Sequence, residues 1–174
     1  MKKKDIWISL AIIAVCGLSI LLYMQRKGYV GIDAGPAEAV LQLKSNLFTN
    51  ITINSGAEPA AINARTYRPK YLSLSIKENG RIWRIESSGP WGDLSKIKVR
   101  NDEATALKLG PPFLIKPQIR KNRSRLSIGF TIIGQAGEQY RNFITKNNSV
   151  VTGAKFKIID ETGNVFESGK FQYG

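Results

Sequence analysis

The chain contains no histidine, and Cys16 is the single cysteine among its 174 residues. Without histidine there is no His general base, no His metal ligand and no Ser-His-Asp or Cys-His catalysis. One cysteine cannot form an intrachain disulfide, and it cannot by itself build an iron–sulfur cluster or a thiolate zinc site. We therefore expect a protein that holds no metal and no cofactor.

Acidic side chains are also scarce, because 13 Asp and Glu stand against 26 Lys and Arg, a formal net charge of +13. Carboxylates are the remaining route to acid–base catalysis. Asp102-Glu103 and Asp160-Glu161 are adjacent pairs in predicted turns, whereas a glycoside hydrolase needs two carboxyl groups that face each other. The sequence therefore predicts that the protein is not an enzyme, with a carboxylate-only hydrolase as the alternative.

One long apolar stretch is present, and its residues 6–24 carry no charge. As a helix rising ~1.5 Å per residue, this stretch is long enough to cross the hydrocarbon core of a bilayer. Trp7 and Tyr23 lie near its two ends, where amphipathic rings favour the headgroup level. We predict a single transmembrane helix at 6–24, which makes the lipid bilayer a partner of the chain.

Basic residues flank both ends of this stretch and set its expected orientation. Lysines occupy residues 2–4, and Arg26 and Lys27 follow the stretch. With the α-amino group, the N-terminal flank carries slightly more positive charge, and the more positive flank stays in the cytoplasm. We expect a cytoplasmic tail at 1–5, a linker at 25–36, and a C-terminal body on the exported, periplasmic side of the inner membrane.

Two processed forms of the N-terminus stay open as alternatives. A cleaved signal peptide would begin with the same basic residues, but Tyr23-Met24-Gln25-Arg26 lacks the small residues of a cleavage site. A lipoprotein would carry its lipid on Cys16, but Val15 stands where a lipobox has Gly, Ala or Ser. The pattern favours an uncleaved anchor.

The rest of the chain alternates apolar and polar residues in short runs, as β-strands do. Leu72, Leu74 and Ile76 alternate with serines, and the pair Asn79-Gly80 that follows suits a type I′ turn. This pattern predicts a hairpin with a strand at 81–86. Other strands are predicted at 40–43, 47–53, 94–99, 105–109, 114–119, 126–132, 155–158, 165–167 and 170–173, and a short helix is expected only within 34–42.

These strands, separated by glycine, proline and asparagine, predict an all-β fold, an antiparallel β-sandwich. The Gly110-Pro111-Pro112-Phe113 break divides the body into a sandwich domain at 37–112 and residues 113–174. The latter form either a second β domain or a continuation of the same sandwich. Pro117 places the strand 114–119 at an edge or a bulge.

Several short phrases resemble exported bacterial β-sandwich modules of the carboxypeptidase-regulatory, or transthyretin-like, type. Ala64-Arg65-Thr66-Tyr67 resembles their turn-to-strand element, with Arg65 where the family has Gly. The stretches 79–83 and 98–110 resemble strands of the same module. The stretch 157–165 resembles the strand–turn–strand hairpins of Ig-like exported domains. The resemblance covers about half of the chain and implies a structural or recognition module without catalytic residues.

Residues 116–125 hold five cations and no acid. These cations are Lys116, Arg120, Lys121, Arg123 and Arg125. Such a segment attracts anionic lipid headgroups or charged polysaccharides. The alternative is a solvated loop that keeps the domain soluble. Binding to nucleic acid is not expected, because the anchor places the body outside the cytoplasm and no aromatic RNA-binding pattern or helix-turn-helix is present.

Trp91 lies in a glycine- and proline-containing loop, where an aromatic ring suits contact with a glycan or a protein partner. The alternative is that it caps the end of the sandwich. The sequence thus predicts a membrane-anchored, exported β-sandwich protein with a non-catalytic binding or scaffolding role at the cell envelope. Two alternatives are an accessory subunit of a larger membrane protein complex, and polyanion or anionic-lipid binding through residues 116–125.

Overall fold

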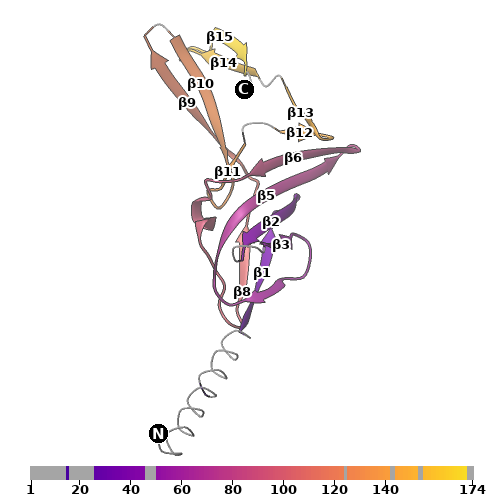
Figure 1. Ribbon diagram of the computed structural model, residues 1–174. Helices are drawn as coiled ribbons and strands as arrows, with labels where there is room; N and C mark the ends of the chain where they lie inside the picture. Colours follow the sequence, from indigo (N-terminus) through magenta and orange to yellow (C-terminus); the bar gives the residue numbers. More distant parts are fainter. Residues whose placement is uncertain are drawn as a thin grey trace, which may run out of the picture.

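The computed structural model describes Val15 and residues 26–45, 50–123, 125–141, 144–152 and 155–171. Apart from helical Val15, these residues form an all-β structure of fifteen strands and one short 3-10 helix, which confirms that the fold is all-β (Figure 1). The predicted tail 1–5 lies outside the described residues, as does the predicted span 6–24 apart from Val15. Within the described ranges, no helix is long and apolar enough to cross a membrane.

In chain order the elements are β1 (Lys27–Asp33), β2 (Glu38–Lys44), β3 (Asn50–Asn54), β4 (Ala60–Asn63), β5 (Thr66–Glu78), β6 (Arg81–Ser87), the 3-10 helix η1 (Gly92–Ser95), β7 (Ile97–Lys98), β8 (Ala104–Lys108), β9 (Leu114–Asn122), β10 (Arg125–Ile133), β11 (Gln139–Tyr140), β12 (Thr145–Lys146), β13 (Ser149–Val150), β14 (Lys155–Ile159) and β15 (Val165–Lys170). Each predicted strand overlaps an observed one, but residues 94 and 95 belong to η1, and the two strands predicted at 165–167 and 170–173 meet the single strand β15, which ends at Lys170. Residues 47–49, 172 and 173 lie outside the described residues.

The largest sheet has seven strands in the order β13-β12-β6-β5-β2-β3, with β7 paired to β5. Side chains alternate between its faces, so Leu72 and Leu74 are buried while the serines between and beyond them stay partly exposed. The β5–β6 hairpin turns at Asn79 and Gly80, whose φ angles of 49° and 72° are the two positive values that a type I′ turn requires. The predicted hairpin is therefore confirmed.

β1 lies at the centre of a three-stranded sheet, antiparallel to β4 and parallel to β8. The segment 25–36, expected to be a linker, thus contains a core strand. Val30 is fully buried, and a Cβ atom added at Gly28 would come within 2.0 Å of the carbonyl oxygen of Arg100. The parallel β1–β8 pair also departs from the predicted antiparallel arrangement, which the other described pairs follow.

The segment 34–42, where a short helix is expected, leads into a strand instead. Ala39, Leu41 and Leu43 are buried while their neighbours on β2 are more exposed, and a period of two residues is that of a strand. In a strand these three side chains lie on one face and can be buried together. In a helix, residues two positions apart point to nearly opposite sides, so they could not share one buried face.

Buried side chains of the seven-stranded sheet and of the three-stranded sheet β4-β1-β8 belong to one hydrophobic cluster. Val30 and Leu107 come from the three-stranded sheet, and Leu41 comes from the seven-stranded sheet. Ile132 and Tyr140 join the same cluster, although they follow the predicted domain boundary at residue 112. A separate second domain at 113–174 stays a prediction.

The β9–β10 hairpin extends away from this core, and the β14–β15 hairpin lies beside it (Figure 1). Phe130 of β10 contacts Phe171, which follows β15, with ring centroids 4.8 Å apart. The two hairpins therefore pack against each other through aromatic side chains.

Candidate interaction surface

The β9–β10 hairpin contains the cationic segment. Nine residue pairs join its strands and end with Asn122 opposite Arg125. Arg123, in the turn, adopts a φ of 52°, the left-handed conformation found in tight hairpin turns. Pro117 belongs to β9, the edge strand of the sheet β11-β10-β9, as its missing N–H group predicts.

The strand register divides the hairpin side chains between two faces. Lys116, Arg120 and Arg125 share one face, because every second residue of a strand and its direct partner point the same way. Lys121 points to the opposite face, and Arg123 lies in the turn. The structure thus places three of the five predicted cations on one face of the hairpin and the other two elsewhere.

All five cations are exposed. Among the described residues, none of the five forms an ion pair within 4.0 Å. On the face that carries three of them, the side-chain amide of Gln118 donates a hydrogen bond of 2.6 Å to the hydroxyl of Thr131. Like charges gathered without a nearby acid create a positive potential that attracts an anionic partner.

The opposite face of the hairpin is apolar and packs against the C-terminal residues. A groove of about 490 Å³ lies between this face and β14. Its lining includes Ile115, Pro117, Ile119, Phe130, Phe156 and Phe171. Phe171 contacts both Phe130 and Phe156, with centroid distances of 4.8 and 5.3 Å. One hairpin therefore offers a basic face and an apolar face.

A buried glutamate supports the base of the hairpin. Glu138 is fully buried, and its Oε1 accepts hydrogen bonds from the Gly110 N–H at 2.8 Å and the Tyr140 hydroxyl at 2.6 Å. Its Oε2 accepts a bond of 2.9 Å from the Ala136 N–H. Burial, followed by the hydrogen bond to Glu138, raises the pKa of Tyr140. The sequence shows this segment only as a flexible glycine-containing loop and gives no sign of the buried carboxylate.

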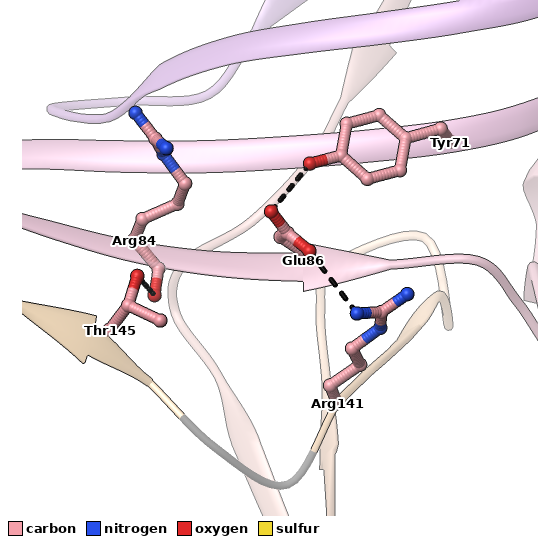
Figure 2. Close-up of polar contacts among 5 residues, drawn as sticks. All are labelled: Tyr71, Arg84, Glu86, Arg141 and Thr145. Atoms are coloured by element: carbon pink, nitrogen blue, oxygen red, sulfur yellow. Dashed lines mark hydrogen bonds and ion pairs between the residues drawn. The ribbon is translucent and has the colours of Figure 1, made fainter. Parts of the chain in front are cut away.

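A second polar cluster, which the sequence does not indicate, lies on the largest sheet (Figure 2). Glu86 accepts a hydrogen bond of 2.6 Å from the Tyr71 hydroxyl and forms an ion pair of 3.4 Å with Arg141. Burial, followed by the hydrogen bond to Glu86, raises the pKa of Tyr71. The guanidinium of Arg84 points away from Glu86. These contacts join β5, β6 and the residue that follows β11.

Trp91 precedes η1 and is half-buried. It packs against the hydrophobic cluster, and a Cβ atom added at Gly89 would meet its indole nitrogen at 3.0 Å. This packing places the indole against the core, and the residue as a whole stays partly exposed. Contact of Trp91 with a glycan or a protein partner stays a prediction.

Asp160, of the second predicted acidic pair, is held within its own turn. Oδ1 of Asp160 accepts hydrogen bonds from the N–H groups of Thr162 and Asn164, at 2.9 and 2.8 Å. The bond from the Thr162 side chain, followed by the Asn164 backbone, lowers the pKa of Asp160. In the described part of the chain, no group of three or more His, Cys, Asp or Glu residues could hold a metal ion. That the protein is not an enzyme stays a prediction.

No family model, no curated protein and no solved structure matches this chain. The fold and the site define an all-β protein with an exposed cationic hairpin. The resemblance to transthyretin-like and Ig-like modules stays a prediction.

Proposed function

We propose that this chain is a membrane-anchored, exported β-sandwich protein with a non-catalytic binding or scaffolding role at the cell envelope, and that the β9–β10 hairpin is its binding element. The observation that carries the proposal is the exposed face of Lys116, Arg120 and Arg125, for which the described residues supply no ion-pair partner. An exposed face that carries three cations and no described ion-pair partner has a positive potential, which attracts an anionic partner.

Two further observations support the other parts of the proposal. The seven-stranded sheet and the sheet β4-β1-β8 contribute buried side chains to one cluster, as the two layers of a sandwich do. The uncharged run at 6–24, flanked by basic residues, has the length and composition of a membrane anchor.

The location is tested by fractionation and protease shaving of cells that express the full chain with a C-terminal epitope tag. We expect the tag in the membrane fraction, and we expect protease added to the periplasmic side to digest it. A tag that stays in the soluble fraction, or that is digested only after the inner membrane is broken, contradicts the proposed anchor and its orientation.

The binding role is tested by cross-linking mass spectrometry on native membranes, with the amines of Lys116 and Lys121 as reporters. We expect both to cross-link to an envelope partner, and we expect the variant Arg120→Glu/Arg125→Glu to lose these cross-links while it keeps both reporters. The matched variant Lys44→Glu/Lys70→Glu changes the net charge equally at two exposed residues of β2 and β5, outside the hairpin and its groove.

The matched variant should cross-link as the parent does. Absence of hairpin cross-links, or an equal loss in both variants, contradicts the proposal. An accessory subunit of a membrane complex further predicts one partner in constant stoichiometry after detergent extraction, and recovery of a monomer alone argues against that role.

The same cations favour a second candidate function, which is binding to anionic lipids or charged polysaccharides. A cation close to an anionic membrane surface contributes roughly 1 kcal/mol of attraction. We expect the full chain, extracted in detergent, to bind phosphatidylglycerol vesicles more tightly than phosphatidylcholine vesicles, with affinity that falls as salt rises. Binding that ignores both salt and lipid charge would contradict this second function.

A further inference from the structure

The outer edge of β9 is open. β9 is the last strand of the sheet β11-β10-β9, and β10 is the only described strand that pairs with it. All nine residues of β9 are exposed. In Figure 1, β9 lies on the outer side of the hairpin, and β14 and β15 lie on the side of β10. An open strand of this length presents a row of backbone groups that can pair with another chain.

The register identifies which backbone groups point outward. Asn122 and Arg125 flank a two-residue turn and therefore form a hydrogen-bonded pair, after which bonded and non-bonded pairs alternate along the hairpin. Pro117 falls in a non-bonded pair, in agreement with its missing N–H group. The N–H groups of Ile115 and Ile119 thus face the open edge, with the carbonyl groups of both residues and of Pro117.

A strand added to this edge would meet different side chains on its two faces. On one face lie Lys116 and Arg120. On the other lie Ile115 and Ile119, each 64% exposed, which line the 490 Å³ apolar groove. Because strand side chains alternate, the complementary segment carries acidic residues at every second position and apolar residues between them.

A second copy of this chain is a poor occupant of the edge. Pairing β9 with β9 of another copy would bring Lys116 and Arg120 close to their own equivalents, and like charges on neighbouring strands are destabilising. Lysine and proline on an edge strand also discourage pairing between copies. An acidic segment would attract Lys116 and Arg120 where a second β9 strand repels them, and it could form the same backbone hydrogen bonds with the edge.

We propose that the open edge of β9 binds an extended segment of a protein partner, in which acidic residues alternate with apolar ones, as an added β-strand. This proposal rests on the binding role of the hairpin and names the chemistry of its partner. Backbone hydrogen bonds supply affinity, whereas the cations and the apolar groove select the sequence.

The test uses the full chain in detergent micelles and fluorescence anisotropy of labelled synthetic peptides. The probe peptide matches the nine residues of β9 in length and alternates Glu with Val. The control peptide has the same composition, with all Glu residues before all Val residues. We expect the alternating peptide to bind at least about tenfold more tightly. Equal binding of the two peptides overturns the proposal.

Backbone methylation separates strand addition from simple charge attraction. In an added strand, the N–H groups of alternate residues face β9, and the N–H groups of the others face away. Two versions of the peptide carry N-methyl groups on one or the other alternate set. We expect one version to lose at least about tenfold in affinity and the other to bind as the parent peptide does. Equal effects of both overturn the proposal.

Two variants at one exposed position test the edge from the side of the protein. Ile119→Pro removes an outward N–H group, whereas the matched variant Ile119→Thr keeps it. Both variants lose the apolar side chain of Ile119 in the groove, so we expect Ile119→Pro to bind at least about tenfold more weakly than Ile119→Thr. Equal affinities of the two variants overturn the proposal. Should Ile119→Pro fail to fold, Arg120→Glu serves instead. This variant should bind the Glu-Val peptide more weakly than the parent chain does, and a Lys-Val peptide more tightly.

Phosphatidylglycerol vesicles are the competing occupant. If they bind through Arg120 and Arg125, bind equally to Ile119→Pro, and no peptide binds, strand addition is overturned while the binding role of the hairpin stands. If the peptides, the vesicles and the cross-links are all insensitive to the hairpin charges, both proposals are overturned.

Discussion

The buried carboxylate of Glu138 accepts a hydrogen bond of 2.6 Å from the hydroxyl of Tyr140, two residues along the chain. The N–H groups of Gly110 and Ala136 are its other donors. Gly134 makes room for this carboxylate, since a Cβ atom there would lie 2.1 Å from Oε1. One buried side chain therefore holds the loop before β9 to the segment that follows β10.

Removal of this acceptor should destabilise the protein strongly. Glu138→Ala leaves the buried donors of Gly110 and Tyr140 and the partly buried N–H group of Ala136 without this acceptor, and we expect the free energy of unfolding to fall by about 3 kcal/mol. Urea-induced unfolding measures the effect. Glu161→Ala, at an exposed turn residue, is the control and should change stability by less than about 0.5 kcal/mol. Similar losses in both variants would contradict the assigned role of Glu138.

Stability should fall at high pH because the pKa of Tyr140 is raised above its ordinary value of 10.0. A raised folded-state pKa means that folding favours the protonated hydroxyl, so its contribution is complete below pH 10 and declines as the pH rises further. We expect a slope of up to about 1.4 kcal/mol per pH unit from this group between about pH 10 and 12. Tyr140→Phe should show a shallower decline in urea unfolding series, and an unchanged slope would contradict the prediction.

Two neighbours on β2 should differ sharply in their sensitivity to truncation. Leu41 is fully buried, whereas Val40 is 37% exposed on the other face of the sheet. We expect Leu41→Ala to lower the free energy of unfolding by about 2–5 kcal/mol, because it leaves a cavity in the core. Val40→Ala should cost less than about 1 kcal/mol in the same urea experiment. Equal costs would mean that the faces of β2 are wrongly assigned.

Two glycine substitutions test whether β1 is a core strand. At Gly28, a new Cβ atom would collide with the Arg100 carbonyl oxygen at 2.0 Å, and we expect Gly28→Ala to cost at least about 3 kcal/mol. At Gly129, the nearest atom would lie 3.9 Å away, and Gly129→Ala should change stability by less than about 1 kcal/mol. Thermal unfolding gives both values. A harmless Gly28→Ala would favour the flexible linker expected from the sequence.

Elements with a local signal are predictable from the sequence. Asn79-Gly80 between two alternating runs identifies the β5–β6 hairpin, because turn and strands are adjacent in the chain. β1 carries no comparable signal, since its partners β4 and β8 follow it at a distance and its glycines suggest a linker. Only the pairing of Tyr29 with Ala61 and Ala104 reveals it as a central strand.

The cationic segment of the β9–β10 hairpin was predictable in composition and not in geometry. The five cations of 116–125 stand out in the sequence, but their division between two faces depends on the register that brings Asn122 opposite Arg125. Glu138 is harder to find, because its donors come from residues 110, 136 and 140 and only the folded chain gathers them. In the sequence, a glutamate after a glycine-rich turn looks the same whether its side chain is buried or exposed to solvent.

The place of β1 between β4 and β8 affects how the chain folds as it leaves the ribosome. β1 is made before both neighbours, and its parallel partner is complete only at Lys108. Until then one edge of β1 stays unpaired and Val30 lacks part of its covering. Long-range pairing of this kind slows folding and leaves nascent strands open to aggregation. We therefore expect β1 to be exposed to aggregation during translation until β8 has emerged.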